Sequence, residues 1–352
     1  MQNNRVGKII RLSDVAAQAG VSVSTASLVL NGKGKISPGV IDIVKETAKK
    51  LNYAPPRPSE IQRRKRRKLV CVGILLNLDF EWAHTWYMLD RIIQELQRTL
   101  EARDIGTILV PISSATSVEK THERIMKQNI QAVYSIHHTD SELFETLESE
   151  GIPVVVIMNS NHQKSFSTIC VDDFQGAYEG TMHLIELGHR NILYVDYATA
   201  ELPALTGDRF VGFRKAFEER GLSFDPAHRI TCTLTNTPFL DERIGEVFAK
   251  KPVPSAVFAM DDYLGARIHA MLTKRGIRVP QDVSMICPGD VLDYSEPYFP
   301  PLTTMSIPFD LMGRFAAELL FNRSERGAGR VNVLKVKQQL IDRGSCAPFK
   351  TN

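Results

Sequence analysis

Residues 11–31 read RLSDVAAQAGVSVSTASLVLN, and this stretch decides the fold of the N-terminal region. Its first half carries a small apolar face made by Val15, Ala16 and Ala19, which predicts a helix that a second helix can approach closely. Gly20 follows where that helix must stop, because glycine accepts a positive φ. The stretch therefore predicts two short helices joined by a tight turn.

The second of these helices is expected to begin after Ser22, a good N-cap residue. One of its faces is apolar and is formed by Ala26, Val29 and Leu30. The opposite face is short-chained and mostly polar, and it consists of Ser24, Ser27, Leu28 and Asn31. A surface of this kind suits contact with base edges in the major groove of DNA.

A third helix is predicted from Ser37-Pro38, with the serine as N-cap and the proline at the first helical position. Val40, Val44 and Leu51 would then close a small core. Spacing alone leaves a second interpretation open, which is an ordinary helical hairpin at the edge of a larger core.

The distribution of charge favours the first interpretation. Residues 1–68 hold 15 Lys and Arg against 4 Asp and Glu, a net charge of +11, whereas the whole chain carries only +3. The remaining residues are therefore net acidic. A basic head on an acidic body is typical of a nucleic-acid-binding module that is joined to another domain.

Composition limits what the rest of the chain can be. A length of 352 residues suggests two or three domains, and a hydrophobic content of 43% is enough for a large core. No apolar run approaches the roughly 18 residues of a membrane span, and no signal-peptide pattern is present. The five cysteines lie far apart without a Cys-x-x-Cys pair, as in proteins with reduced thiols. We expect a cytoplasmic, nucleoid-associated protein with no membrane partner.

Several motifs resemble those of the lactose/galactose repressor (LacI/GalR) family of bacterial transcription regulators. The N-terminal motifs are Asp14-Val-Ala, Ala19-Gly-Val-Ser-Val-Ser-Thr, Val29-Leu-Asn-Gly and Leu51-Asn-Tyr53. Later motifs are Gly151-Ile-Pro-Val-Val, Leu187-Gly-His-Arg, Arg209-Phe-Val-Gly-Phe, Ile277-Arg-Val-Pro-Gln-Asp-Val-Ser and Pro300-Pro-Leu-Thr-Thr. The resemblance runs from about residue 10 to about residue 345. It implies a ligand-responsive, sequence-specific regulator, usually a repressor, that binds a pseudo-palindromic operator as a homodimer.

The predicted DNA-binding headpiece spans residues 1–56. We expect DNA contacts from this headpiece and the linker after it, at Ser13, Ser22, Val23, Ser24, Thr25, Ser27, Leu28, Asn31, Lys35, Ser37, Tyr53, Arg57 and Ile61. Many relatives have an arginine at the position of Leu28, which could pair with guanine. Leucine cannot, but it can contact a thymine methyl group, so we expect an operator that tolerates loss of guanine there. The alternative is that Leu28 packs inward.

Residues 57–68 form a basic linker with a net charge of +6. Away from DNA it is expected to be a solvated linker, and on DNA its side chains can neutralise phosphates. The resemblance implies a hinge helix that inserts a leucine into the minor groove, but the usual Asn-x-x-Ala…Ser-Leu pattern is absent here. Ile61 is the one sizeable apolar side chain available, and we hypothesise that it acts as the wedge.

From residue 69 onward, β-branched runs alternate with helical patterns, which predicts α/β architecture with two parallel sheets. Expected strands of the first set are 69–76, 107–110, 132–136 and 153–157, and those of the second are 191–195, 229–232, 256–259 and 283–287. The resemblance implies the two-lobed periplasmic-binding-protein type I fold, with doubly wound sheets and three crossings between lobes. We expect residues 69–352 to hold a first lobe of about 69–169 and 308–328, and a second of about 170–307 and 329–346.

The effector is expected to bind between the lobes, at the carboxyl ends of the strands. Asn77, Asp79, Glu81 and Trp82 follow the first strand, and aromatic faces with carboxylates suit a sugar ring. A tryptophan at this place could instead pack in the core or in a subunit interface. The resemblance adds four further effector contacts, which are Arg209, Asp261, Asp290 and Phe309.

One departure from the family pattern affects these contacts. Gly289 stands where relatives often carry a ligand-binding aspartate, so that contact is either missing or moved to Asp290. The effector cannot be named from the sequence. A neutral sugar or sugar derivative is the first hypothesis, although Arg209 leaves an anion open. Effector binding would change the angle between the lobes, and with it the spacing of the two headpieces.

Enzyme classes find no support in the sequence. It holds no Gly-x-x-x-x-Gly-Lys-Ser/Thr loop, no His-Glu-x-x-His and no Gly-x-Ser-x-Gly elbow. His137 and His138 are adjacent, so on a strand end they point to opposite sides and fit a solvated loop better than a metal site. We expect neither catalysis nor a cofactor or metal. The alternative function is a sugar-binding sensor or transport protein without specific DNA recognition.

Overall fold

The computed structural model describes residues 10, 12–30, 32, 36–53, 68–77, 85–113, 115–136, 141–198, 203–233, 236–326 and 331–349. The chain divides into two compact units. The first consists of Met1–Asp79, Gln97–Thr168 and Ala316–Asn332, and the second of Phe80–Leu96, Ile169–Phe315 and Val333–Asn352. Within the described ranges, every helix is too short or too polar to cross a lipid bilayer.

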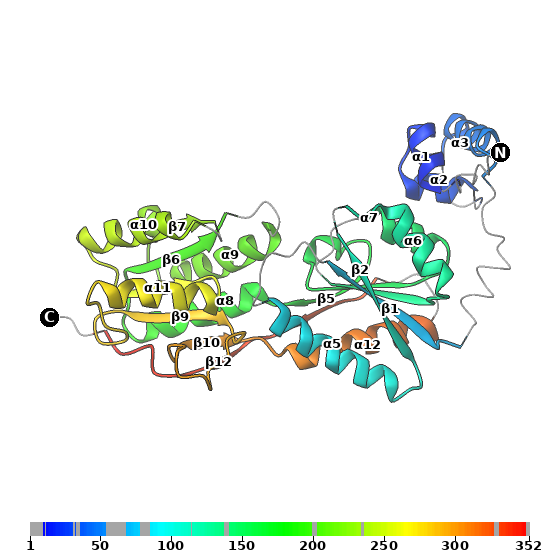
Figure 1. The fold of residues 1–352 in the computed structure, drawn as a ribbon. Coiled ribbons are helices and arrows are strands. Elements are labelled where there is room, and N and C mark those ends of the chain that lie inside the picture. The colour runs from blue at the N-terminus through cyan, green and yellow to red at the C-terminus, as the bar shows by residue number, and fades with distance from the viewer. Residues whose placement is uncertain are drawn as a thin grey trace, which may run out of the picture. The chain divides into compact units, whose positions relative to one another are not determined.

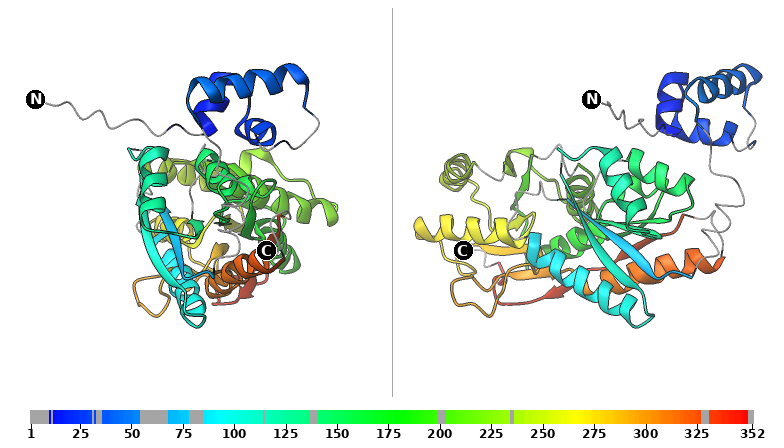
Figure 2. Two further views of the ribbon diagram at one scale, coloured as in Figure 1. Left: turned by 90° about the vertical axis from the view of Figure 1, so that its right-hand side faces the viewer. Right: turned by 45° about the vertical axis from the view of Figure 1, so that its right-hand side comes forward.

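The N-terminal headpiece is a three-helix domain, as predicted (Figure 2). Its helices are α1 (Leu12–Ala19), α2 (Val23–Leu30) and α3 (Pro38–Lys50). Gly20 turns the chain between α1 and α2 with a φ of 67°. The buried core holds Leu12, Val15, Ala16, Ala26, Val29, Val44 and Ala48. The small side chains of α1 and α2 let the two helices approach closely, which confirms the predicted function of Val15 and Ala16.

The first sheet has six strands in the order β11-β5-β4-β3-β1-β2 (Figure 1). They are β1 (Cys71–Asn77), β2 (Gly106–Ile112), β3 (Ala132–Ile136), β4 (Val154–Ile157), β5 (Ser167–Val171) and β11 (Val333–Val336). The pairs β1–β2, β1–β3 and β3–β4 are parallel, as the alternation of strands and helices predicted. The helices of this part are α5 (Thr85–Glu101), α6 (Val118–Lys127), α7 (Ser141–Ser149) and α12 (Phe309–Arg326), with a 3-10 turn at Ser160–His162.

The second sheet also has six strands, in the order β12-β10-β9-β8-β6-β7 (Figure 1). They are β6 (Ile192–Tyr197), β7 (Arg229–Cys232), β8 (Ala256–Ala259), β9 (Ser284–Gly289), β10 (Thr303–Ser306) and β12 (Gln339–Ile341). Helices α8 (Asp173–Glu186) and α9 (Pro203–Glu219) pack on one face. Helices α10 (Thr237–Ala249) and α11 (Asp262–Lys274) pack on the other, and a 3-10 turn occupies Pro226–His228. Each sheet is therefore an α/β layer structure, and the predicted fold class is confirmed.

Four strands differ from the sequence prediction. β5, β10, β11 and β12 were not expected, and β12 pairs with β10 in the antiparallel direction. β11 is an edge strand of the first sheet, although Val333–Asn352 belongs to the second compact unit, and our assignment of residues 329–346 to the second lobe stays a prediction. β11 and β12 are edge strands, whereas β5 and β10 lie inside their sheets. All four are only three to five residues long, and periodicity over so few residues does not reveal the neighbour with which a strand pairs.

Candidate DNA interface and effector site

The second helix of the headpiece presents the face that was predicted to touch DNA. Ser24 and Leu28 are exposed, whereas Val23, Thr25 and Ser27 are partly exposed. Leu28 keeps 42% of its surface accessible, so the alternative in which it packs inward does not hold in this structure. The helix thus offers one apolar side chain among hydroxyl groups.

A hydroxyl cluster marks the start of α2. The Oγ atom of Ser22 accepts a hydrogen bond from the backbone N–H of Thr25 at 3.1 Å, which confirms Ser22 as the N-cap. The same Oγ lies 2.8 Å from the Ser24 hydroxyl and 2.8 Å from the Thr25 hydroxyl. Hydroxyl groups at a helix N-terminus suit contact with phosphate oxygens.

The remaining predicted DNA contacts fall into three groups. Ser37 is exposed as the N-cap of α3, and Tyr53 is partly exposed just after that helix. Ser13 is 9% exposed in the first turn of α1, and its contact with DNA stays a prediction. The other four, which lie outside the described residues, are Asn31, Lys35, Arg57 and Ile61.

Arg209 has a partner within the second unit. This residue of α9 is 4% exposed, its Nε donates to Oδ1 of Asp173 at 2.8 Å, and one terminal nitrogen lies 2.8 Å from the same oxygen as an ion pair. Its other terminal nitrogen donates to the carbonyl oxygen of Met260, just after β8. Burial raises the pKa of Asp173, and the Arg209 guanidinium opposes that shift. The buried arginine is therefore neutralised by the chain itself.

Asp173, the partner of Arg209, was not named by the sequence analysis. It is the first residue of α8, and it directly follows Asp172, the N-cap of that helix. Two successive carboxylates at the end of a strand were a usable signal, but the strand itself, β5, was not expected.

Asp261 and Asp262 follow β8 and have different environments. Asp261 is the N-cap of α11 and accepts a hydrogen bond from the backbone N–H of Leu264 at 2.7 Å. Asp262 is fully buried, and its Oδ2 accepts from the backbone N–H groups of Val291 and Leu292 at 2.8 and 2.9 Å. Burial raises the pKa of Asp262 to about 6, although these backbone donors oppose the shift. Asp261 is the more accessible of the two for a ligand.

Gly289 leaves room for this buried carboxylate. A Cβ atom at Gly289 would lie 2.5 Å from Oδ1 of Asp262, and the backbone there has a φ of 140°. The next residue, Asp290, accepts hydrogen bonds from Arg343 at 2.6 Å and from Thr304 at 3.0 Å. The role of Asp290 as an effector contact stays a prediction. Such a contact requires that the ligand bind a carboxylate that already accepts hydrogen bonds from Arg343 and Thr304.

The remaining predicted effector contacts receive mixed support. Phe309 is completely buried, and the guanidinium of Arg91 lies 5.6 Å from the centre of its ring. Arg91 lies 3.1 Å from Asp310, and contact of the Phe309 ring with the effector stays a prediction. Asn77 ends β1 and is partly exposed. The other three, which lie outside the described residues, are Asp79, Glu81 and Trp82.

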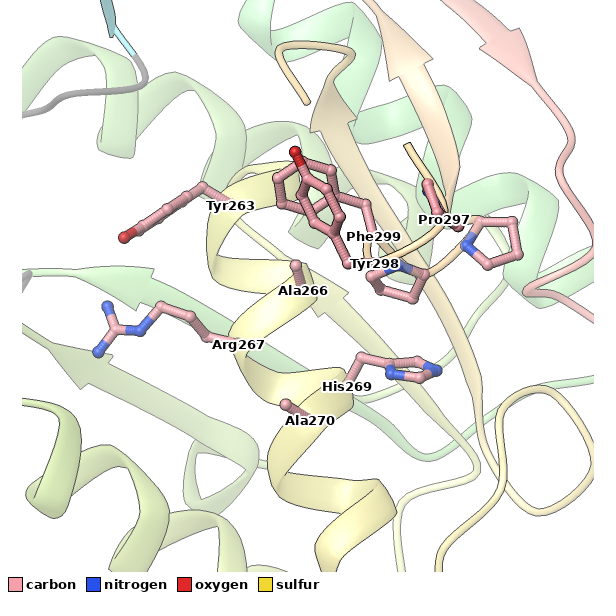
Figure 3. Close-up of a pocket in the computed structure, with 10 residues that line it drawn as sticks. Tyr263, Ala266, Arg267, His269, Ala270, Pro297, Tyr298 and Phe299 are labelled. Atoms are coloured by element: carbon pink, nitrogen blue, oxygen red, sulfur yellow. The ribbon is translucent and has the colours of Figure 1, made fainter. Parts of the chain in front are cut away.

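A pocket of about 550 Å³ opens on another surface of the second unit (Figure 3). One wall is α11, from which Tyr263, Ala266 and Ala270 project, and the opposite wall carries Tyr298 and Phe299. Its lining also includes Arg267, His269, Pro297, Pro300 and Pro301. Among the predicted effector contacts that the structure describes, none lines it. Its aromatic and proline side chains are typical of a surface that contacts another macromolecule.

Three carboxylates of the second unit have partners within the chain. The carboxylates of Asp173, Asp262 and Asp290 are engaged by guanidinium groups, backbone amides or hydroxyls. Among the residues that the structure describes, no three His, Cys, Asp or Glu side chains gather closely enough to hold a metal ion. Donors and acceptors held in this way can form hydrogen bonds to a polar ligand.

Comparisons with known proteins agree with the two-part architecture. Residues 11–56 match the pattern described as "Bacterial regulatory proteins, lacI family", and residues 181–346 match "Periplasmic binding protein-like domain". The solved transcriptional regulator CelR–cellobiose complex is 26% identical, with a TM-score of 0.70 over 96% of this chain and 100% of that one. The lac repressor dimer bound to operator and an anti-inducer is 20% identical and shares the fold, with a TM-score of 0.65 over 97% of this chain and 100% of that one.

Curated relatives show the family directly. CelR of Thermobifida fusca is 28% identical over 89% of this chain and 91% of its own length. The regulator DegA of Bacillus subtilis (strain 168) is 30% identical over 96% of this chain and 98% of its own length. The headpiece matches the lacI family pattern, and DegA is similar over nearly the whole length of both chains. The chain therefore belongs to the LacI family of ligand-responsive, DNA-binding transcriptional regulators.

Proposed function

We propose that this protein is a repressor that binds a pseudo-palindromic operator as a homodimer, with α2 of each headpiece in the major groove. The observation that carries the proposal is the exposed face of α2, where Leu28 stands among the hydroxyls of Ser24 and Thr25. One short helix covers too few base pairs for specificity in a genome, so two headpieces must act together. The net charge of +11 on residues 1–68 supports binding to phosphates.

The operator base that faces Leu28 should be one that an apolar side chain can contact. An apolar side chain favours a thymine methyl group and cannot donate two hydrogen bonds to guanine. A selection from random duplexes with the full-length protein tests this. We expect a twofold-symmetric site in which guanine is dispensable at the position facing Leu28. An invariant guanine contacted by α2 would contradict the assignment, and a complete lack of sequence preference would contradict the repressor.

We propose further that the effector is a sugar or sugar derivative and that the protein binds it without catalysis. A related regulator, 26% identical, was solved as a complex with cellobiose. The buried donor–acceptor pair of Arg209 and Asp173, with Asp261 after β8, supplies the hydrogen-bonding groups that hydroxyls require. The same proposal places the protein in the cytoplasm, together with its operator.

Two experiments test the effector class. The duplex selection is repeated in the presence of a panel of mono- and disaccharides, and the selected operator is titrated with the protein in the presence of each sugar. Coupling between sites is typically about 1–3 kcal/mol, so the effector should change operator affinity roughly 5–150-fold. The direction of the change distinguishes an inducer from a co-repressor. A panel in which no sugar changes the affinity, while another metabolite does, would refute the carbohydrate assignment.

The pocket beside α11 is the surface that we assign to the homodimer. Tyr298 is 71% exposed, and its ring lies 4.6 Å from that of Phe299, so a large aromatic group projects from this face. Ala266 and Ala270 leave space on the neighbouring helix (Figure 3). In a twofold dimer the same patch meets itself, and the aromatic group of one copy can fill the pocket of the other. The occupant we propose is a second copy of this chain.

A further inference from the structure

Arg209 and Asp173 carry an inference about which ligands the effector site accepts. Both side chains are buried, and they come from neighbouring helices, α9 and α8, which lie side by side in the second unit (Figure 1). The Nε–H of Arg209 donates to Oδ1 of Asp173, one terminal nitrogen lies 2.8 Å from the same oxygen, and the other donates to the Met260 carbonyl. A guanidinium has five N–H donors, so these contacts, taken over the described residues, leave donors that we assign to a ligand.

The nearby charges leave this pair neutral. Asp208 and Lys335 are the other ionised groups that act on Asp173, and they lie 4.0 Å from each other as a second, more exposed pair. Their effects on Asp173 have opposite signs. The positive charge of Arg209 is therefore matched by Asp173 alone, and an incoming anion would meet a carboxylate next to the guanidinium.

We propose that Asp173 determines the charge of the effector: by neutralising Arg209 in advance, it makes the site accept uncharged, hydroxyl-bearing ligands and reject phosphorylated or carboxylated ones. This inference rests on the proposed function, in which Arg209 contacts the effector. A hydroxyl group can donate to the carboxylate and accept from the guanidinium, so the pair suits it on both counts. An ionised phosphate is repelled by the carboxylate, and its unprotonated oxygens can accept hydrogen bonds but cannot donate any to it.

The test compares variants of Asp173 in the full-length protein, with inorganic phosphate as the probe. Asp173→Asn removes the carboxylate charge, and we expect phosphate to bind about tenfold more tightly or better than to the parent. That factor is what one charge-assisted hydrogen bond freed for the ligand is worth. Asp173→Glu keeps the charge and should bind phosphate no better than the parent. Calorimetry at constant ionic strength measures both.

Asp208→Asn is the matched control, because it removes the same charge beside Arg209 from a half-exposed position paired with Lys335. It should leave phosphate binding unchanged. A folded Asp173→Asn protein without any gain in phosphate binding would overturn the proposal. The parent protein provides a second measurement that needs no variant, which is the affinity for glucose and cellobiose against that for their 6-phosphates. Tighter binding of a phosphorylated sugar than of its neutral counterpart would also overturn it.

These outcomes separate the inference from the proposed function. If Asp173→Asn gains phosphate binding but no neutral sugar changes operator affinity, the inference on charge stands and the carbohydrate effector fails. If a neutral sugar changes operator affinity and Asp173→Asn gains nothing, the carbohydrate effector stands and the inference fails.

Discussion

Single buried side chains in the second unit fix the position of the backbone and side-chain groups that hydrogen-bond to them. Asp262 illustrates this, because its Oδ2 accepts hydrogen bonds from two backbone N–H groups after β9 and from the Tyr294 hydroxyl at 3.3 Å. Gly289 has no side chain that would collide with it. The carboxylate therefore fixes the start of the loop that carries Tyr298 and Phe299. Its charge state should affect the stability of the protein.

We predict a pH dependence from Asp262. Its pKa is raised from 3.8 to about 6 in the folded protein, so folding takes up a proton between these values. The resulting stabilisation is fully present below about pH 4 and is lost as the pH rises through about 6. Asp262→Asn lacks this component. Going from pH 5 to pH 7, the free energy of unfolding of the parent should fall by roughly 1 kcal/mol relative to the variant.

Urea unfolding of the two proteins at both pH values measures this difference. Using the difference removes the contribution of other carboxylates, such as Asp282, whose pKa is lowered to about 2 by Arg278. A stability difference between parent and variant that is independent of pH would show that Asp262 does not titrate in this range.

At the scale of secondary-structure elements, the crossing of α8 and α9 places the Arg209–Asp173 pair. Gly212 of α9 lies against α8 so closely that a Cβ atom there would come 2.2 Å from the carbonyl oxygen of Phe174. Asp173 is the neighbour of Phe174 in the same helix. The close approach that brings the two ionised groups together therefore depends on a glycine in the middle of a helix, where glycine is otherwise unfavourable.

Gly212→Ala should separate these helices. We expect it to lower the stability of the protein by about 3 kcal/mol or to prevent folding, because backbone rather than a flexible side chain blocks the added methyl group. Gly207→Ala, in the same helix, is the matched control, since nothing lies within 4 Å of its Cβ position. It should be neutral or stabilising by up to about 1 kcal/mol. Thermal unfolding of both variants measures this difference in stability. Equal melting temperatures of the two variants would contradict the close crossing of α8 and α9.

At the scale of the whole molecule, function requires two headpieces on one operator. The proposed dimer surface beside α11 would bring two headpieces into one molecule, because a surface that pairs with its own copy gives a closed twofold dimer. The exposed aromatic group at Tyr298 is the kind of side chain that contributes most of the energy at the centre of an interface. Loss of the dimer should then weaken operator binding without unfolding the headpiece.

Tyr298→Asp should weaken self-association by a factor of about 30 or more. An aromatic residue at the centre of an interface contributes about 2 kcal/mol to the free energy of association, and the substitution also buries a charge in its place. Phe239→Asp is the control, because Phe239 is an exposed aromatic residue of α10 outside the pocket lining. Sedimentation of both variants measures the dimer fraction, and operator titration follows the loss of affinity. A Tyr298→Asp protein that remains dimeric would exclude this surface as the interface.

The sequence by itself determined the headpiece and the α/β class. The three helices are specified by local signals: apolar residues at helical spacing, the turn at Gly20, the cap at Ser22 and the proline that begins α3. Each of these signals acts over a few residues. The outward position of Leu28 followed from the same spacing. The central strands of both sheets were also predictable, because buried parallel strands are continuous apolar runs.

Only the tertiary structure decided the rest. The edge strands β11 and β12 depend on the neighbours with which they pair. The partner of Arg209 is 36 positions away in the chain, and it is set by the crossing of two helices that periodicity does not specify. The burial of Ser13 and Phe309 depends in the same way on what packs over them. Contacts between distant segments carry no local signature, because their geometry exists only after the elements have packed together.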